Sequence, residues 1–282
     1  MTDQLHIAVI APGEMGAAVG GRLVEQGARV STVLTGRSRE SVARAKAAGL
    51  QDAAYEILGE TDMILSILPP GEATGLAQRL APVLAAAPRK PLYVDCNAVS
   101  PATVQAIAAI IQPTGASFVD AGIVGGPPRP GYAPMIFASG PDAGRFAMLN
   151  DLGLKIRTME GGVGQASALK LCYAAVTKGL QAIGVSAMLG AIEAGIGEPF
   201  IAELARSQAR LLDRFVDGTP DVFPKAYRWV AEMEEIGAFL GGGGQQLYDG
   251  AARQFERLAA DHAGDRKDEA AILALLKSRP GS

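Results

Sequence analysis

The fold is decided by residues 5–39, LHIAVIAPGEMGAAVGGRLVEQGARVSTVLTGRSR. Leu5 to Ile10 is a short apolar run, rich in β-branched residues, and predicts a buried strand. A helical pattern follows from about Gly16 to Gln26, and Gly27 is a typical residue at a helix end. Arg29 to Leu34 predicts a second strand. Strand, glycine turn, helix and strand in this order form the βαβ unit that binds the pyrophosphate of a dinucleotide.

The turn itself, APGEMG at Ala11–Gly16, matches the dinucleotide-binding pattern G-x-G-x-x-G imperfectly, because Ala11 replaces the first glycine. A glycine-rich turn occurs in other α/β proteins as well. This one follows a strand and opens a helix, which is the context in which backbone N–H groups and the helix N-terminus bind phosphate. The predicted cofactor-binding residues of the turn are Pro12, Gly13, Glu14, Met15 and Gly16.

The pattern of strands and helices continues to about residue 160. Strands are predicted at Met63–Leu68, at Leu92–Val94, from Ser117, at Met135–Ser139 and at Lys155–Thr158. Helices are predicted at Ser41–Ala48, Ala73–Leu84 and Pro101–Ile111, the last with Ser100 as its N-cap. This alternation predicts an α/β fold of the Rossmann type, with a doubly wound, mostly parallel sheet.

The second half of the chain has a different character. Residues 165–194 are almost all small or apolar, which predicts one long helix that is buried on most sides. Further helices are predicted at Pro199–Phe215, Asp221–Leu240, Gln245–Ala263 and Arg266–Lys277, with a break at the four glycines 241–244. The predicted domains are therefore a dinucleotide-binding domain, residues 1–162, and an all-α domain, residues 163–282, which provides substrate and dimer contacts.

Composition excludes several classes of function. The net charge of −3 argues against a nucleic-acid or anionic-membrane surface, since both require a basic excess. Two cysteines and two histidines, far apart in sequence, provide neither a disulfide framework nor metal-ligand spacing, so no metal is predicted. No signal peptide is visible, and no uninterrupted apolar run reaches the length of a membrane span. The expected setting is the cytoplasm.

The end of the second predicted strand bears on the choice of cofactor. NAD enzymes of this fold place an acidic residue here to bind the ribose 2′-hydroxyl, and none occurs between Arg29 and Arg39. Arg37 and Ser38 can instead bind a 2′-phosphate. The alternative is a solvated basic loop before a helix. The missing carboxylate favours NADP (NADPH) over NAD.

Other candidate residues follow two later strands, because ligands of open α/β sheets bind at the carboxyl ends of strands. Leu68, Pro69 and Pro70 end one strand, and the prolines also have a structural explanation as residues that stiffen a loop. Asn97 follows another strand. Its side chain can cap the next helix or bind the nicotinamide ribose, and the sequence leaves both open.

Four blocks resemble the β-hydroxyacid dehydrogenase and 6-phosphogluconate dehydrogenase superfamily. They are APGEMG at 11–16, DCNAVSP at 95–101, DAGIVGG at 120–126 and GQASALKLCYA at 164–174. They occur in the family's order and with roughly its spacing. The resemblance implies a Rossmann domain, a long connecting helix and a helical domain, together with an NAD(P)-dependent dehydrogenase or reductase activity.

The resemblance also implies that Lys170, on the long helix, is the proton donor and acceptor beside the nicotinamide. The residues agree, because a lysine in a nearly uncharged helix is partly desolvated and its pKa is expected to fall. The alternative is a lysine that extends along the bundle surface to water. Tyr173 stands one turn later, where the family has Asn or His, and either shares proton transfer or only packs.

The family's substrate loop, D-A-P-V-S-G-G, corresponds here to residues 120–126. The predicted substrate-binding residues are Ile123, Val124, Gly125 and Gly126, and the two glycine N–H groups can hold an anion. Val124 replaces the family's Ser, and Ala174 replaces the Asn four residues after the lysine. Both changes predict a less polar site that favours a bulkier or less anionic small molecule than a typical hydroxyacid.

The block RWVAEMEEI, residues 228–236, resembles a poorly characterised branch of the same superfamily. Glu232, Met233 and Ile236 have helical spacing, which favours core packing with a charged rim over direct substrate contact.

We therefore predict an NADP-dependent oxidoreductase that transfers hydride to or from a C=O carbon, with imine (C=N) reduction as a variant. An NADPH-binding sensor without turnover is the alternative from another class. The apolar long helix and the helical second half predict a homodimer that uses the C-terminal helices.

Overall fold

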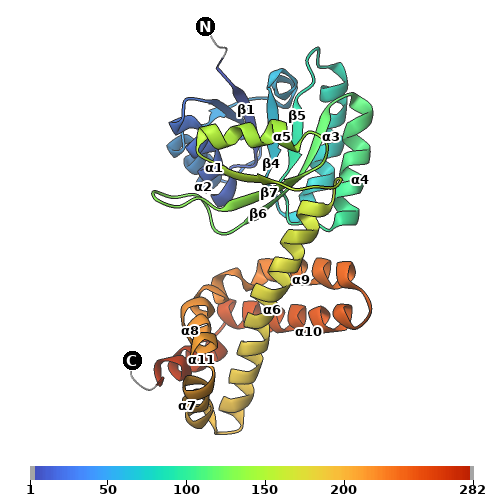
Figure 1. The fold of residues 1–282 in the computed structure, drawn as a ribbon. Helices are drawn as coiled ribbons and strands as arrows, with labels where there is room; N and C mark the ends of the chain where they lie inside the picture. Colours follow the sequence, from blue (N-terminus) through green and yellow to red (C-terminus); the bar gives the residue numbers. More distant parts are fainter. Residues whose placement is uncertain (1–3, 280–282) are drawn as a thin grey trace. The chain divides into compact units, whose positions relative to one another are not determined.

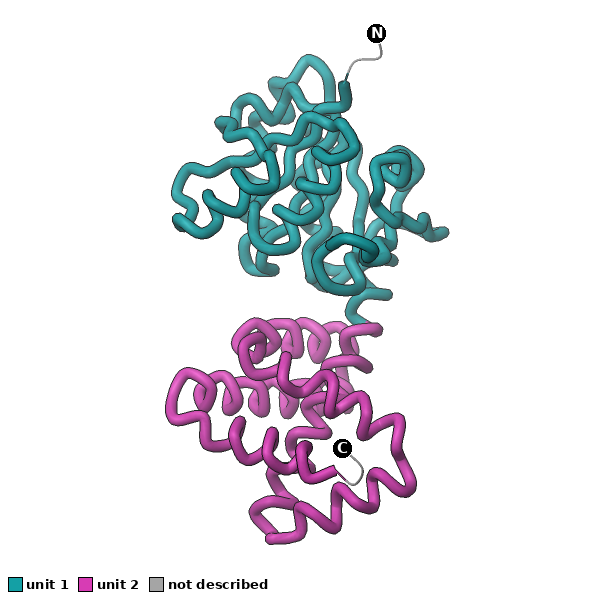
Figure 2. The backbone as a smooth tube through the Cα atoms, turned by 90° about the vertical axis from the view of Figure 1, so that its left-hand side faces the viewer, with its two compact units in different colours: residues 1–171 teal, residues 172–282 magenta. Residues whose placement is uncertain are grey.

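The structure is a computed structural model that describes residues 4–279. The chain divides into two compact units that meet between Leu171 and Cys172, and Figure 2 colours them teal and magenta. The division falls within one long helix, α6 (Gln165–Glu193).

The first unit contains a sheet of eight strands in the order β3-β2-β1-β4-β5-β6-β7-β8. Neighbouring strands are parallel except β6 and β7, so the predicted doubly wound, mostly parallel sheet is confirmed. The strands are β1 (His6–Ile10), β2 (Arg29–Thr32), β3 (Gln51–Asp52), β4 (Met63–Ser66), β5 (Leu92–Asp95), β6 (Ser117–Val124), β7 (Met135–Ser139) and β8 (Lys155–Thr158). The two-residue edge strand β3 was not predicted, because both of its residues are polar and exposed.

Helices cover both faces of this sheet, as Figure 1 shows. They are α1 (Glu14–Glu25), α2 (Arg39–Ala47), α3 (Ala73–Ala86), α4 (Pro101–Ile111) and α5 (Ala143–Ala147), with short 3-10 turns at Tyr55–Glu60, Pro70–Glu72, Gln112–Thr114 and Met148–Leu152. Alternate residues of each strand face opposite sides. Ile7 therefore packs with side chains of α1 and α5 in one core, and Ala8 packs with side chains of α3 and α4 in the other.

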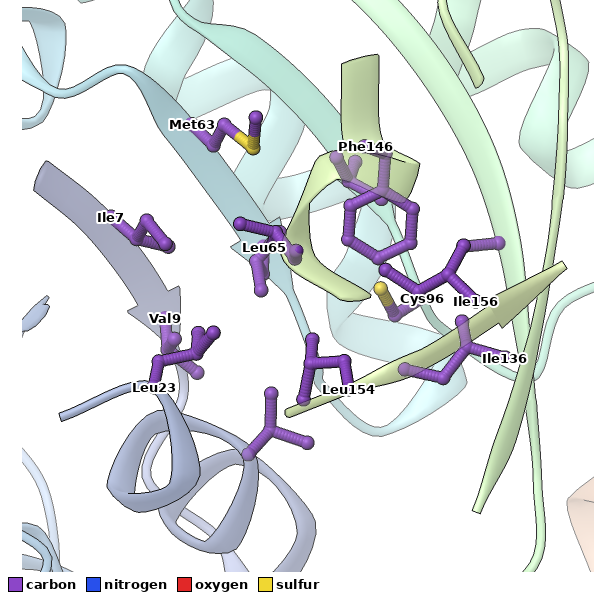
Figure 3. Close-up of a cluster of buried hydrophobic side chains, with 14 of the residues drawn as sticks. Ile7, Val9, Leu23, Met63, Leu65, Cys96, Ile136, Phe146, Leu154 and Ile156 are labelled. Carbon is purple, nitrogen blue, oxygen red and sulfur yellow. The ribbon is translucent and has the colours of Figure 1, made fainter. Parts of the chain in front are cut away.

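The core beneath α1 and α5 is the one shown in Figure 3. Phe146 of α5 lies in it beside Cys96, which follows β5, and Ile156 of β8. All three side chains are at least nine-tenths buried. The tight packing of this core holds the central strands of the sheet in place.

Helix α6 is less buried than its sequence predicted. Tyr173, Val176 and Ile183 remain 53%, 66% and 57% exposed. By length and composition α6 is apolar enough to cross a membrane, which corrects the expectation that no stretch would be, but half of its most apolar window is buried in the fold. Core helices of soluble proteins share this property.

The second unit is built from the rest of α6 and from α7 (Gly197–Ser207), α8 (Ala209–Gly218), α9 (Ala226–Leu240), α10 (Gly242–Ala263) and α11 (Lys267–Lys277), with 3-10 turns at Thr219–Asp221 and Phe223–Lys225. Two predictions were wrong here. The single helix expected at 199–215 is divided at Gln208, whose φ of −137° and ψ of 44° are not helical.

The expected four-glycine break was also wrong, because α10 begins inside it. Gly241 and Gly242 have positive φ and make the turn, whereas Gly243 and Gly244 are already helical. A Cβ on Gly244 would lie 2.8 Å from the Cβ of Leu240, so this glycine allows α9 and α10 to join closely. In α9, Met233 and Ile236 are fully buried, as the packing hypothesis predicted, and Glu232 forms an ion pair with Lys178 of α6.

Candidate active site

The glycine turn after β1 leads directly into α1. Gly13 is the N-cap residue, and α1 begins at Glu14, two residues before the predicted start. Gly13 is exposed, and among the described residues no non-neighbouring atom lies within 4 Å of the position a Cβ would take. No side chain caps α1 at Gly13, and the space beside this residue is open, which suits a phosphate cradle.

Gly16 is needed for a different reason. A Cβ at this position would run into the carbonyl oxygen of Ala11, so only glycine lets α1 pack this closely on the end of β1. Pro12 is buried, Glu14 is exposed, and Met15 packs partly against the core of Figure 3. Packing at Pro12, Met15 and Gly16 therefore holds the backbone of the turn in place.

The loop after β2 carries the two residues predicted to select NADP. Ser38 is the N-cap of α2 and accepts a hydrogen bond from the Ser41 N–H at 3.3 Å. The Arg37 side chain is about a quarter exposed, and its Nη1 lies 3.8 Å from Oε2 of Glu72. Ser38 therefore has a structural role already, whereas Arg37 forms a loose ion pair that a stronger anion can replace.

A row of buried polar side chains crosses the middle of the sheet near the carboxyl ends of the strands. Ser66, Asp95, Asp120 and Ser139 are paired in register across β4, β5, β6 and β7, and each is at most 1% exposed. None of the four was assigned a role from the sequence, although Asp95 directly follows the strand predicted at Leu92–Val94. Asp95 and Asp120 each open one of the four blocks that resemble the superfamily, but their alignment depends on strand register, which the sequence does not reveal.

Asn97 continues this network. Its Oδ1 accepts from the Leu68 N–H at 2.5 Å, and its Nδ2 donates to Ser66 Oγ at 2.8 Å and to Asp95 Oδ2 at 3.0 Å. The helix-cap alternative was wrong, because Ser100 caps α4 by accepting from the Thr103 N–H. Asn97 instead ties the strand end at Leu68, ahead of Pro69 and Pro70, to the strand end at Asp95.

The electrostatics of this edge involve Lys170. Burial raises the pKa of Asp95 to about 6, hydrogen bonds from Asn97 oppose the shift, and the charges of Asp120 and Lys170 raise and lower it respectively. Burial also raises the pKa of the Cys96 thiol, and the charge of Lys170 again opposes the shift. Lys170 is therefore close enough to the strand ends to act electrostatically on the groups there.

The position of Lys170 is set by its packing on β6. A Cβ on Gly122 would lie 3.0 Å from the Lys170 Cβ and 2.8 Å from the carbonyl oxygen of Ala166, so α6 rests on bare strand backbone. Tyr173 follows three residues later on the same helix and is more than half exposed, while Ala174, four residues later, is buried.

The predicted substrate loop begins inside β6. The Ile123 side chain is buried in the core beneath α1 and α5, so only its main chain is open to a ligand. Val124 is half-buried, on the strand face that also carries Gly122, and Gly126 is exposed. Gly125 has a φ of 125°, and a Cβ there would collide with the hydroxyl of Tyr132, a residue that the sequence reasoning did not single out.

Two protein families match separate parts of this chain. Residues 6–152, more than half of it, match the NAD binding domain of 6-phosphogluconate dehydrogenase, and residues 191–258 match a domain of unknown function, DUF1932. A mitochondrial 3-hydroxyisobutyrate dehydrogenase from Drosophila melanogaster is 27% identical over 207 residues, which are 72% of this chain and 63% of the fly protein.

Solved structures agree on the fold. A conserved protein of unknown function, described as similar to 3-hydroxyacid dehydrogenases, is 27% identical with a TM-score of 0.70, and the match covers 95% of this chain and 99% of that one. Mycobacterium tuberculosis 3-hydroxyisobutyrate dehydrogenase with L-serine is 21% identical with a TM-score of 0.67, and the match covers 96% of this chain and 99% of that one. An imine reductase from Myxococcus stipitatus in complex with NADP+ is 18% identical with a TM-score of 0.53, and the match covers 97% of this chain and 99% of that one.

Three observations agree with one another. They are the glycine turn after β1, the position of Lys170 near the carboxyl ends of the strands, and the match to an NAD-binding domain. The chain is a dinucleotide-binding dehydrogenase or reductase, and it belongs to the β-hydroxyacid dehydrogenase and 6-phosphogluconate dehydrogenase superfamily.

Proposed function

We propose that this protein is an NADP-dependent reductase or dehydrogenase in which Lys170 exchanges a proton with the substrate's oxygen or nitrogen. The proposal rests on one observation: Lys170 packs against Gly122, beside the carboxyl ends of β5 and β6. Ligands of open α/β sheets bind at this edge. Backbone packing holds Lys170 near this edge, which supports a role as general acid for a substrate bound there.

The cofactor fits the residues present. The open N-terminus of α1 at Gly13 suits the pyrophosphate, and Arg37 suits a 2′-phosphate, which would replace Glu72 as its partner. Pro69, Pro70 and Asn97 border the edge where the nicotinamide end of an extended dinucleotide arrives. Bound NADPH supplies the hydride that goes to the C=O or C=N carbon. Lys170 supplies the proton to the heteroatom and regains one from solvent.

The residues at the end of β6 bear on the class of substrate. Val124 supplies no hydroxyl where the family has Ser, whereas the main-chain N–H groups of Gly125 and Gly126 remain for an anion or a polarised oxygen. We infer a small carbonyl or imine compound that is less polar than 3-hydroxyisobutyrate. The resemblance to imine reductases, at 18% identity, concerns the fold alone.

A homodimer accounts for the exposed apolar surface of the second unit. Val176 and Ile183 of α6 and Leu247 of α10 are each more than half exposed and line an apolar groove of about 460 Å³. We propose that a second copy of the chain covers this groove, because an unpaired patch of this kind is unusual on a monomer. Sedimentation equilibrium at micromolar concentration tests this, and a monomeric mass would contradict it.

The enzymatic proposal is tested with the full chain and a defined panel. NADPH is supplied with a cyclic imine and a small aldehyde, and NADP+ with 3-hydroxyisobutyrate and L-serine. Lys170→Ala is expected to abolish turnover while the Kd for NADPH stays within about twofold. Lys155→Ala, an exposed lysine of β8, is the matched control and keeps full activity. Equal activity in Lys170→Ala removes this lysine from the mechanism, and NADPH binding without turnover of any compound favours the sensor alternative.

A further inference from the structure

The N-terminus of α6 is capped by residues of the sheet rather than by its own side chains. Asp120 of β6 accepts hydrogen bonds at Oδ2 from the N–H groups of Gly164, at 2.9 Å, and Ser167, at 3.0 Å. Its Oδ1 accepts from the Ser167 hydroxyl at 2.6 Å. A carboxylate has four lone-pair sites for such donors, and its negative charge suits a helix N-terminus.

A second strand completes the cap. Ser139 of β7 lies opposite Asp120 in the antiparallel register, donates to Asp120 Oδ2 at 3.1 Å and accepts from the Ala166 N–H at 3.1 Å. Asp120, Ser139 and Ser167 are at most 1% exposed. Buried hydrogen bonds of this kind are costly to break, because the main-chain donors would be left without partners.

The same face of β6 also carries the contact under Lys170. Asp120 and Gly122 are two residues apart on the strand, so they point to one side of the sheet. Asp120 holds the helix at residues 164 and 167, while Gly122 contacts Ala166 and Lys170. The first contact fixes the axial position of α6, and the second fixes how close Lys170 comes to the strand.

We propose that Asp120 is a positioning residue for Lys170, which sets the height and rotation of α6 through main-chain hydrogen bonds without touching the substrate. The proposal rests on the proposed function of Lys170 for its catalytic meaning. Asp120→Asn keeps the shape of the side chain but turns one oxygen into a donor. The variant loses the negative charge that suits the helix N-terminus, and an NH2 group in place of Oδ2 faces the N–H donors of Gly164 and Ser167, so the cap is weakened and the first turns of α6 shift.

The decisive readout needs no substrate. Reductive methylation with ¹³C-formaldehyde labels lysine amines, and the signal of Lys170 is identified by its loss in Lys170→Arg. Asp120→Asn is expected to move the Lys170 signal while the Lys155 signal stays in place. Asp261→Asn is the matched control, because Asp261 also accepts two main-chain N–H groups, at 2.9 Å each, but caps α11. It is expected to lower the melting temperature without moving the Lys170 signal.

Kinetics supply the second readout. With whichever panel compound the wild-type protein turns over, Asp120→Asn is expected to lower kcat roughly 100-fold, because misplacing a reacting group by about 1 Å has that effect. The Kd for NADPH is expected to stay within about twofold. If Asp120→Asn does not fold, Ser139→Ala and Ser167→Ala each remove part of the cap and are expected to move the Lys170 signal.

The outcomes separate the two proposals. A folded Asp120→Asn variant with an unmoved Lys170 signal overturns the positioning role, and so do unmoved signals in both serine variants. Full activity of Lys170→Ala overturns the proposed function, while a moved signal in Asp120→Asn would still establish the structural coupling.

Discussion

Gly122 of β6 and Lys170 of α6 are in direct contact, and a Cβ on the glycine would lie 3.0 Å from the Cβ of the lysine. Such a distance is tighter than most real contacts, and the 2.8 Å to the Ala166 carbonyl oxygen is tighter still. Strand backbone and helix backbone are both rigid, so neither neighbour can turn aside as a flexible side chain would.

Gly122→Ala is therefore expected to push α6 outward and displace Lys170. We expect kcat to fall at least about tenfold with little change in the Kd for NADPH, measured by steady-state kinetics and fluorescence titration. Gly144→Ala is the matched control, since Gly144 lies exposed in α5 and its added Cβ meets open space among the described residues. That change is expected to raise stability slightly. Unchanged kcat in Gly122→Ala would show that the close approach has no catalytic effect.

Arg37 is expected to control the choice of cofactor. Arg37→Ala removes the guanidinium proposed to bind the 2′-phosphate, and a lost charge-assisted contact of about 2 kcal/mol lowers the NADPH-to-NADH affinity ratio roughly 30-fold. Glu72→Gln is expected to raise NADPH affinity, because Glu72 competes for Arg37 at 3.8 Å. Arg39→Ala, the exposed neighbour in α2, is the control. An unchanged ratio in Arg37→Ala would assign the 2′-phosphate to other residues.

Asp95 is expected to make stability depend on pH. Its pKa is raised from 3.8 to about 6 in the folded protein, chiefly by burial, so the folded state holds this proton more tightly than the unfolded state. The contribution of Asp95 to the free energy of unfolding is largest below pH 4, and about 3 kcal/mol of it is lost as the pH rises through 6 to 7. Asp95→Asn is expected to lack this fall. Urea denaturation of both proteins at pH 4 and pH 7 measures it, and parallel pH dependences would contradict the assignment.

The ion pair between Lys178 and Glu232 holds α6 to α9, and the Lys178 Nζ also lies 5.1 Å from the Trp229 ring centre. Burial lowers the pKa of Lys178, and Glu232 opposes that shift. Glu232→Gln is expected to destabilise the protein by about 2 kcal/mol, less than a fully buried pair because each side chain is about a fifth exposed. Replacing both with Lys178→Met and Glu232→Leu is expected to recover most of the loss. A double variant less stable than Glu232→Gln would refute this account.

The two thiols are expected to differ in reactivity. Cys96 lies in the core of Figure 3, where burial raises its pKa, whereas Cys172 is exposed on α6. A thiol reagent is expected to modify one cysteine quickly in the native protein and the second only on unfolding. Cys172→Ser is expected to remove the fast phase, and a fast phase that persists in this variant would contradict the burial of Cys96.

Local patterns determined most of the fold in advance. Short apolar runs marked β1, β4 and β7, and Ser100-Pro101 marked the start of α4, because each of these signals lies within a few neighbouring residues. The glycines at 241–244 misled the prediction, since only two of them needed positive φ.

Features that depend on distant residues were not predictable in the same way. The burial of α6 was overestimated at Val176 and Ile183, because hydropathy records that a side chain is apolar and not whether its own chain covers it. In the site, Lys170 and the glycine turn were found from motifs. The roles of Asp120 and Ser139 appear only once β6 and β7 are paired and the start of α6 is placed against them.

The central claim is that the turn at Gly13 binds a dinucleotide and that Arg37 selects the phosphorylated one. Isothermal titration of the full chain with NADPH and with NADH tests it most directly. Saturable binding of both is expected, with NADPH at least about tenfold tighter. No heat of binding with either nucleotide would contradict the account.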